Sequence, residues 1–383
     1  MLMLAAVLLV VASAMVFYVI AVYPILLAVF ARRTAPPVQK DMGFRTTVSV
    51  LVAVHNGEEF IRGKLECLLG LDYPAHLMEI LVVSDGSTDA TEAIVESFAD
   101  RGVRLIRTSH AGKAAAVNAA LCHASGEVLF LTDVRQALDA YALSHLVANF
   151  ADPSIGAVTG ELRFLGPDRT GEEADMELYW RYELLARRRH SRIDSIFNTT
   201  GCIYAIRRSL AAPIPPDTLA DDAVIPLKAF FRGYRVICDP EAIAFDHPTS
   251  EGEEFQRKLR TLAGLWQVYV RLPELFTTAN RMRLHFLSHK FARLALPWAI
   301  LLMCAATMAL PASQFRSLLL TDELALVALA VLDHFVPKGF FLKRVSSPAR
   351  SFLTMNLASL LAIGVFVVPP ETLWRPTRVK VRH

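Results

Sequence analysis

The fold of this chain is decided by a stretch that begins with Val48-Ser49-Val50-Leu51-Val52-Ala53-Val54 and closes with His55-Asn56-Gly57. Two similar apolar runs follow it: Ile80-Leu81-Val82-Val83, closed by Ser84-Asp85-Gly86, and Val128-Leu129-Phe130-Leu131, closed by Thr132-Asp133. Short, nearly continuous apolar runs are typical of strands that are buried on both faces of a parallel sheet. Open α/β sheets bind ligands beyond the carboxyl ends of their strands, so we expect the three polar closures to meet in one crevice.

Strand and helix patterns alternate from residue 46 to about residue 250, which predicts an α/β domain with a Rossmann-like, mostly parallel mixed sheet. The expected helices are Glu58–Leu69, Asp89–Asp100, Lys113–Ala124, Ala137–Phe150 and Ala223–Phe231. Further expected strands are Ile155–Leu162, Asn198–Ile206 and Arg235–Ile237. The helical stretch Glu172–Arg192 combines aromatic and basic residues, which fits either contact with a membrane surface or an ordinary solvated helix.

The two ends of the chain are apolar. Met1–Phe30 is long enough to cross a bilayer of about 30 Å. We favour an anchor over a signal peptide because the start carries no charge. Arg32, Arg33 and Lys40 follow it, and the positive-inside rule then places the next domain in the cytoplasm.

The C-terminal region contains two further expected spans, Leu294–Leu310 and Phe352–Val368. Leu318–Val336 between them is weaker because it contains Asp322, Glu323, Asp333 and His334, and charges at membrane depth are costly. Basic clusters follow at residues 338–350 and 375–382, so the side of the membrane reached by the C-terminus stays open.

Composition excludes some classes of protein. The formal net charge of +3 does not indicate general affinity for nucleic acid. The five cysteines are scattered without close pairs, which argues against a zinc site or a disulfide framework and suits a reducing compartment.

Three polar residues are candidates for a nucleotide-diphosphate site. Asp85 at a strand end can accept hydrogen bonds from a base or a ribose, although Asp-Gly-Ser alone is a common turn. Asp133 follows a second strand, and a carboxylate beside a bound diphosphate suits Mg²⁺ or Mn²⁺. Lys113, after Gly112, opens a helix whose N-terminus favours anions. The chain has no Walker pattern and no Gly-x-Gly-x-x-Gly fingerprint.

Two later groups complete the set of candidates. Asp221 and Asp222 precede a helix, where acids also serve as simple caps. Arg257 and Arg260 share a helical face at i, i+3, which suits either a solvated basic face or a clamp for a leaving diphosphate.

Together these motifs resemble the membrane-bound family 2 glycosyltransferases of the GT-A fold, related to the cellulose, hyaluronan and poly-N-acetylglucosamine synthases. The resemblance covers residues 46–270 and also includes Trp374-Arg375-Pro376 near the C-terminus. It is carried by Val50-Leu51-Val52-Ala53-Val54-His55-Asn56-Gly57-Glu58, Val83-Ser84-Asp85-Gly86-Ser87-Thr88-Asp89, Gly112-Lys113-Ala114, Leu131-Thr132-Asp133, Gly201-Cys202-Ile203-Tyr204, Ala220-Asp221-Asp222 and Arg257-Lys258-Leu259-Arg260-Thr261.

The resemblance implies a role for each matching residue. Asp222 matches the catalytic general base, and Asp133 matches the first acid of the metal-binding Asp-x-Asp motif. Arg260 matches the arginine that holds the diphosphate. The remaining expected donor-binding residues are Ala53, His55, Asp85, Lys113 and Arg257, and the acceptor-side candidates are Asp221 and Trp266.

Three departures from the family pattern matter. Arg135 replaces the second acid of Asp-x-Asp, which removes a metal ligand and adds a cation. Asp221 replaces the glutamate of Thr-Glu-Asp. Thr261 replaces the tryptophan that supports the acceptor sugar in processive synthases, which puts long-chain synthesis in doubt.

We therefore expect an inverting glycosyltransferase that moves a hexose or N-acetylhexosamine from a nucleotide sugar to a glycan or lipid-linked acceptor at the membrane. The expected donor is a UDP-sugar. The main alternative is a catalytically weakened nucleotide-sugar-binding or support subunit of a synthase complex. A transporter component or a dehydrogenase-type Rossmann enzyme fits less well, the latter because the glycine fingerprint is missing.

The expected layout places a cytoplasmic catalytic domain in an inner or plasma membrane protein. Its parts are an anchor at 1–31, a linker at 32–45, the GT-A domain at 46–275, an interfacial segment at 276–293, a transmembrane region of two or three segments at 294–370 and a basic tail at 371–383.

Overall fold

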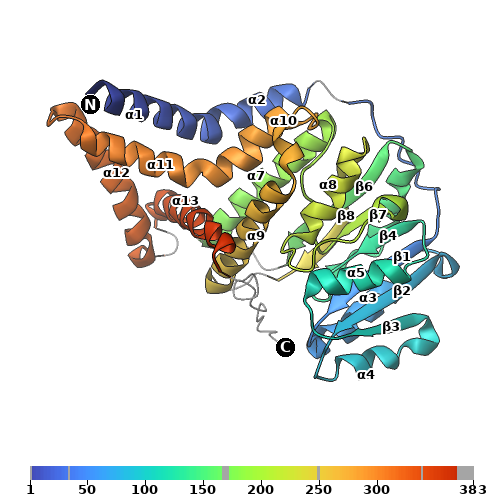
Figure 1. Cartoon of the computed structure of the whole chain (residues 1–383). Coiled ribbons are helices and arrows are strands. Elements are labelled where there is room, and N and C mark those ends of the chain that lie inside the picture. Colours follow the sequence, from blue (N-terminus) through green and yellow to red (C-terminus); the bar gives the residue numbers. More distant parts are fainter. Residues whose placement is uncertain (1, 33–34, 166–171, 248–250, 338–339, 369–383) are drawn as a thin grey trace. The chain divides into compact units, whose positions relative to one another are not determined.

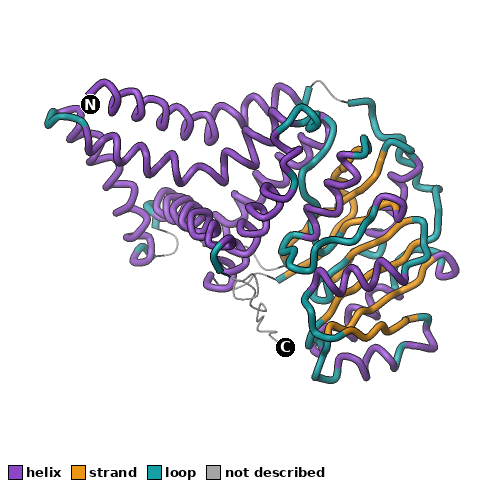
Figure 2. Tube along the Cα trace, in the orientation of Figure 1, coloured by secondary structure: helices purple, strands orange, loops and turns teal. Residues whose placement is uncertain are grey.

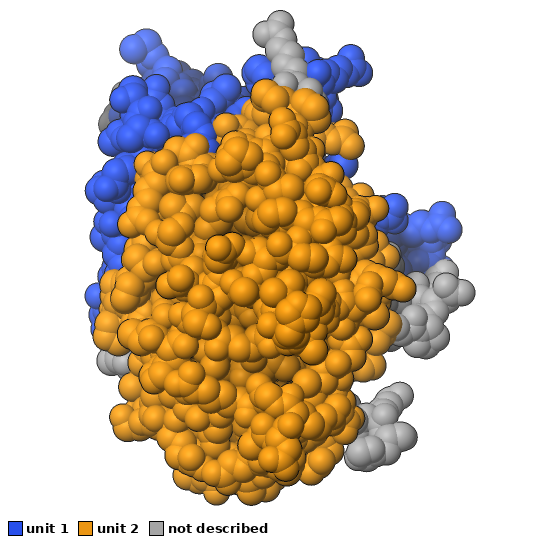
Figure 3. Space-filling view, turned by 90° about the vertical axis from the view of Figure 1, so that its right-hand side faces the viewer, with its two compact units in different colours: residues 1–32, 166–186, 249–383 blue, residues 33–165, 187–248 orange. Residues whose placement is uncertain are grey.

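The computed structural model describes residues 2–32, 35–165, 172–247, 251–337 and 340–368 (Figures 1 and 2). These residues fall into two compact units, coloured separately in Figure 3. The sheet unit comprises residues 33–165 and 187–248, and the helical unit comprises residues 1–32, 166–186 and 249–383.

The described strands of the sheet unit form one eight-stranded sheet with the order β3-β2-β1-β4-β7-β6-β8-β5. Neighbours among β3, β2, β1 and β4 are parallel, as are β6 and β8, whereas β7 runs antiparallel to both β4 and β6. The strands are β1 Val48–Val54, β2 Met78–Asp85, β3 Val103–Thr108, β4 Val128–Leu131, β5 Ala137–Leu138, β6 Ile155–Phe164, β7 Tyr204–Arg207 and β8 Arg235–Asp246.

The central strands are buried because both faces of the sheet are covered by helices (Figure 1). All four residues of β4 are buried, as are six of the seven residues of β1. Helix α5 packs on β1 and β2 through Ala114, Ala116, Val117 and Ala120, whose small side chains allow a close approach. The helices are α3 Glu58–Leu69, α4 Thr91–Glu96, α5 Lys113–His123, α6 Ala142–Ala148 and α8 Asp221–Phe231, with α7 Glu172–Ile193 shared between the units.

The parallel register brings the three polar closures to one edge of the sheet. Strand β1 lies between β2 and β4, and Leu51 is level with both Leu81 and Leu131. Asp85, the last residue of β2, and Asp133, two residues after β4, therefore both lie at the carboxyl ends of strands that flank β1, as predicted from their sequence positions.

Some local predictions were wrong. The expected helix Ala137–Phe150 begins as strand β5, which pairs with β8, and becomes helical only at Ala142. The expected strand Asn198–Ile206 starts only at Tyr204, because residues 199–203 form a turn in which Ile203 N–H donates to Thr200 O at 2.9 Å. The edge strand β3 was not predicted.

Strand β8 is longer than the predicted Arg235–Ile237. The strand continues through Pro240 at an irregularity where the register with β6 shifts between Thr159 and Glu161. Proline is tolerated in a sheet at such positions because no ladder hydrogen bond is required there.

The helical unit contains three stretches that are long and apolar enough to cross a membrane: Leu2–Phe30, Arg283–Ala309 and Lys343–Phe366. They correspond to the three expected spans, with shifted boundaries. The elements are α1 Leu2–Phe17, η1 Tyr18–Val22, α2 Tyr23–Phe30, α9 Glu251–Arg271, α10 Arg283–His285, η7 Phe286–Phe291, α11 Ala292–Ala309, α12 Gln314–Leu332 and α13 Lys343–Ala362.

Helix α12 is the weaker segment noted in the sequence, and it is not among those three stretches. Its Glu323 accepts a hydrogen bond from Thr307 Oγ1 on α11 at 2.8 Å. Asp333, just after α12, is completely buried and pairs with Lys343 and Arg350 at 3.1 and 2.9 Å. Two of the acids that weakened this segment, Glu323 and Asp333, are thus partnered within the helical unit.

Candidate active site

A lysine and three carboxylates form the centre of the candidate site. Lys113, the first residue of α5, lies with its Nζ 3.0 Å from Asp133 Oδ1 and 3.4 Å from Asp221 Oδ1. Burial lowers the pKa of Lys113, but the carboxylates of Asp133, Asp221 and Asp222 raise it by more, so the ammonium stays charged. The lysine therefore joins the loop after β4 to the start of α8.

Asp222 is the acid in this group with a strongly shifted pKa. Burial, followed by the neighbouring charge of Asp221, raises its pKa to about 7, although Lys113 and Arg187 oppose the shift. A carboxylate with a pKa near neutral is a good proton acceptor at physiological pH.

The backbone of Asp222 is held by the turn before β7. Thr199 donates to Asp222 O from both its N–H and its Oγ1, at 2.9 and 2.8 Å. Gly201 faces the carboxylate, since a Cβ at this position would lie 3.5 Å from Asp222 Oδ2. Thr200, between Thr199 and Gly201, accepts a hydrogen bond from Arg187 Nη1 at 2.6 Å.

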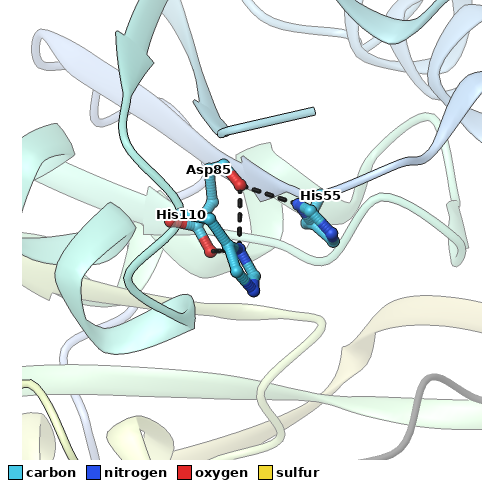
Figure 4. A group of neighbouring side chains, drawn as sticks. All are labelled: His55, Asp85 and His110. Carbon is cyan, nitrogen blue, oxygen red and sulfur yellow. Dashed lines mark hydrogen bonds and ion pairs between the residues drawn. The ribbon is translucent and has the colours of Figure 1, made fainter. Parts of the chain in front are cut away.

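Asp85 lies beside two histidines at the end of β2 (Figure 4). The carboxylate is buried and accepts the N–H groups of Ala111 and Gly112 at 2.8 and 2.9 Å. Nδ1 of His55 and Nδ1 of His110 lie 2.7 and 3.1 Å from Asp85 O, and the two rings stack with centroids 4.1 Å apart. Asp85 therefore fixes the loop that leads into Lys113.

The cation at position 135 is paired. Arg135 Nη2 lies 2.5 Å from Asp246 Oδ2 at the end of β8, and Gln136 Nε2 donates to the same oxygen at 2.8 Å. Asp246 is buried. The Asp-x-Asp motif therefore has an arginine in place of its second acid, and that arginine neutralises a carboxylate from β8.

Sequence reasoning missed several residues of this site. His110, Arg187 and Asp246 stand in none of the motifs, and Tyr204 stands in the Gly201-Cys202-Ile203-Tyr204 motif without a predicted role. The fold brings all four residues to the site. The Tyr204 hydroxyl is buried and has no hydrogen-bond partner among the described residues, and burial followed by the charges of Asp221, Asp222 and Asp133 raises the pKa of the phenol. Two signals were available in the sequence: the position of His110 just before Gly112-Lys113, and the place of Tyr204 in the quoted motif.

Three predicted site residues lie in the helical unit. Arg257, Arg260 and Trp266 are all on α9. Their roles therefore remain predictions. Ala53 and His55, at and just after the end of β1, are half-buried in the sheet unit.

The chain matches a known protein family over this region. The family model for Glycosyl transferase family 2 matches residues 49–213. Among curated proteins, the chain is 26% identical over 267 residues to "Probable glycosyltransferase YdaM" of Bacillus subtilis, covering 66% of this chain and 63% of that protein. It is 23% identical over 265 residues to the poly-beta-1,6-N-acetyl-D-glucosamine synthase of Staphylococcus epidermidis, covering 67% of this chain and 63% of the synthase.

A solved structure matches nearly the whole chain. The mannosyltransferase PcManGT from Pyrobaculum calidifontis, in complex with GDP-Man and Mn²⁺, aligns with a TM-score of 0.76 and 24% identity, covering 94% of this chain and 99% of that one. Residues 49–213 thus match the family 2 glycosyltransferases, in agreement with the predicted family, and the α/β fold is that of the mannosyltransferase structure, so the predicted GT-A-like fold is confirmed. It spans about 63% of the length of the two curated relatives.

Proposed function

We propose that this protein transfers a sugar from a nucleotide sugar to a hydroxyl group of a glycan or lipid-linked acceptor at a membrane, with inversion at the anomeric carbon. The observation that carries the proposal is the cluster of Lys113, Asp133, Asp221 and Asp222 at the carboxyl edge of the sheet. In this cluster the Lys113 ammonium lies beside Asp133, the expected metal ligand, and Asp222 is a second carboxylate with a pKa of about 7.

Asp222 is the proposed general base. It accepts the proton of the acceptor hydroxyl as the oxygen bonds to the anomeric carbon, and the bond to the nucleoside diphosphate breaks with its electron pair leaving on the phosphate. A single displacement of this kind requires one base and no covalent intermediate. Asp221 and Trp266 are the proposed acceptor-side residues.

The proposed binding of the diphosphate relies on charge. Lys113 stands at the N-terminus of α5, where backbone N–H groups favour anions, and Arg257 and Arg260 are the further proposed contacts. Positive groups aimed at the departing phosphate stabilise the charge that develops in the transition state.

A divalent cation fits this donor set at Asp133. The Asp133 side chain is 38% exposed, and Mg²⁺ is commonly bound by one or two carboxylates together with substrate phosphates. When bound, the cation supplies charge to the departing diphosphate. Arg135 stands in place of the second acid and is ion-paired with Asp246. We therefore propose that the donor phosphates would contribute most of the remaining ligands, whether the cation is Mg²⁺ or Mn²⁺.

The nucleoside is proposed to bind beside Ala53, His55 and Asp85. Both oxygens of Asp85 already accept backbone N–H groups, so its contribution includes fixing the 110–112 loop under the base. The family resemblance favours a UDP-sugar. GDP-mannose is the second candidate because the PcManGT structure, which matches nearly the whole chain, contains GDP-Man.

The layout proposed from the sequence places the catalytic domain, residues 46–275, on the cytoplasmic side of an inner or plasma membrane. The membrane location is supported by the three apolar stretches of the helical unit, and the cytoplasmic side is proposed from Arg32, Arg33 and Lys40 after the first of them. The proposed acceptor is correspondingly a growing glycan or a lipid-linked sugar.

The proposal is tested with the full-length protein in membranes and a panel of radiolabelled UDP- and GDP-sugars, followed by sizing of the product. Transfer of label from one donor to a membrane-extractable product is the expected result. Binding of a nucleotide sugar without transfer or hydrolysis, for every donor and with either metal, would instead support the non-catalytic support subunit.

A further inference from the structure

A buried lysine that the proposed chemistry does not use lies beneath the loop of Asp133. Lys64, on α3, is 3% exposed, and its Nζ donates to Thr132 Oγ1 and to Gln136 O, each at 2.7 Å. These acceptors stand at the two ends of the five-residue loop 132–136, which contains both Asp133 and Arg135. Burying an ammonium group costs free energy, and these two hydrogen bonds offset part of that cost.

The hydrogen bonds continue beyond the loop. Thr132 Oγ1 accepts from Lys64 and donates its own proton to Cys202 O at 2.7 Å. Cys202 belongs to the turn 199–203, in which Thr199 binds the backbone of Asp222 and Gly201 faces its carboxylate. A chain of hydrogen bonds from α3 therefore joins the loop of Asp133 to the turn that holds Asp222.

A second residue of α3 contacts strand β5, which directly follows this loop. Leu138 N–H donates to Cys67 Sγ at 3.3 Å, and Cys67 lies one helical turn after Lys64. Burial lowers the pKa of Lys64 to about 8, which still leaves the ammonium form in excess at neutral pH. No motif of the family resemblance includes Lys64.

We propose that Lys64 is a positioning residue for sugar transfer, which sets the separation of Asp133 on the donor side from Asp222 on the acceptor side. The inference rests on the proposed function. A displacement of about 1 Å between groups that must act together can reduce a rate by about 10²-fold, even when binding of the separate substrates survives.

The test compares Lys64→Met with the wild-type full-length protein in membranes. Methionine keeps most of the volume of the side chain but leaves Thr132 Oγ1 and Gln136 O without their donor. We expect kcat to fall about 10- to 100-fold, while the Kd for the nucleoside diphosphate, measured by isothermal titration, changes by less than about threefold. Thr132→Val should lower kcat in the same way, and Thr132→Ser should restore it because serine keeps the hydroxyl.

Lys228→Met is the matched control. Lys228 also binds a backbone carbonyl, Pro213 O at 2.6 Å, but it does so on the outer part of α8, so the loss of one lysine clamp should leave kcat unchanged. The inference is overturned if Lys64→Met or Thr132→Val keeps the wild-type kcat, or if Thr132→Ser is as impaired as Thr132→Val. If Lys64→Met does not fold, the two Thr132 variants decide the question. A wild-type protein that transfers no sugar would overturn the proposed function itself.

Discussion

At the scale of single residues, the pKa of Asp222 has a direct consequence for activity. As a base, Asp222 works only when ionised, and its pKa is raised from 3.8 to about 7 by burial and by Asp221. We therefore predict that kcat/KM for the donor rises about tenfold per pH unit below pH 7 and levels off above it, because kcat/KM reports ionisation of the free enzyme. Initial rates at subsaturating donor between pH 5.5 and 8.5 measure this, and a flat profile across that range would exclude Asp222 as the base.

The Arg135–Asp246 pair leads to a second prediction. Arg135→Asp restores the Asp-x-Asp pattern but places a second acid beside the buried Asp246, so it should lower the melting temperature of the sheet unit. Adding Asp246→Asn removes the repulsion and should recover stability. In both variants we predict that less Mn²⁺ is required for half-maximal activity.

The Arg135 prediction has a matched control and an outcome that would contradict it. Arg107→Ala, which breaks an exposed ion pair with Glu92, serves as the control and should change neither stability nor the metal requirement. An unchanged Mn²⁺ requirement in both Arg135 variants would mean that position 135 does not face the metal.

The residues that could be found from the sequence are those that end strands or begin helices. Asp85, Asp133 and Asp222 follow this rule, because the polar ends of buried strands and the first turns of helices meet at one edge of the sheet. Tyr204 and Asp246 could not be found in this way. Tyr204 appears as an ordinary strand residue, and the partner of Asp246 is 111 positions away in the chain.

At the scale of elements, the turn after β2 controls the start of α5. Gly86 has φ +64°, and a Cβ there would lie 2.7 Å from His110 N, inside the loop that Asp85 holds. We predict that Gly86→Ala weakens nucleotide binding at least tenfold, because the loop before Lys113 must move. Gly102 provides the matched control, since its φ is +83° but a Cβ there meets no atom within 4 Å.

The comparison separates backbone strain from displacement of the loop. Gly102→Ala should cost about 1 kcal/mol of stability and leave the Kd for nucleotide unchanged. Equal nucleotide affinity in the two variants would contradict the proposed dependence of the site on the 110–112 loop.

Elements with a continuous apolar or amphipathic pattern were predicted well, and elements at the edge of the sheet were not. The expected helix Glu58–Leu69 matches α3 at both ends, because its apolar face and its acidic first turn agree. Strand β5 was missed because only two residues pair, and that pairing with β8 depends on a partner more than a hundred residues away. Strand β3 alternates buried and exposed residues at the sheet edge, which the continuous apolar pattern of the central strands did not anticipate.

At the scale of the whole molecule, the proposed orientation can be tested with a natural cysteine. Cys122 on α5 is exposed, whereas Cys202 and Cys238 are buried. We predict that a membrane-impermeant maleimide labels Cys122 in inside-out vesicles but not in sealed right-side-out vesicles. Cys122→Ser identifies the labelled site, and labelling of Cys122 from the outside would place the sheet unit on the other side of the membrane.

The central claim is that Asp222 is the base at a site that holds a nucleotide sugar. Its most direct test is the kcat of Asp222→Asn relative to wild type, measured together with the Kd for the nucleoside diphosphate in the same membranes. We predict a loss in kcat of about 10²- to 10⁴-fold with a Kd that is essentially unchanged. Turnover of Asp222→Asn at the wild-type rate would contradict the account.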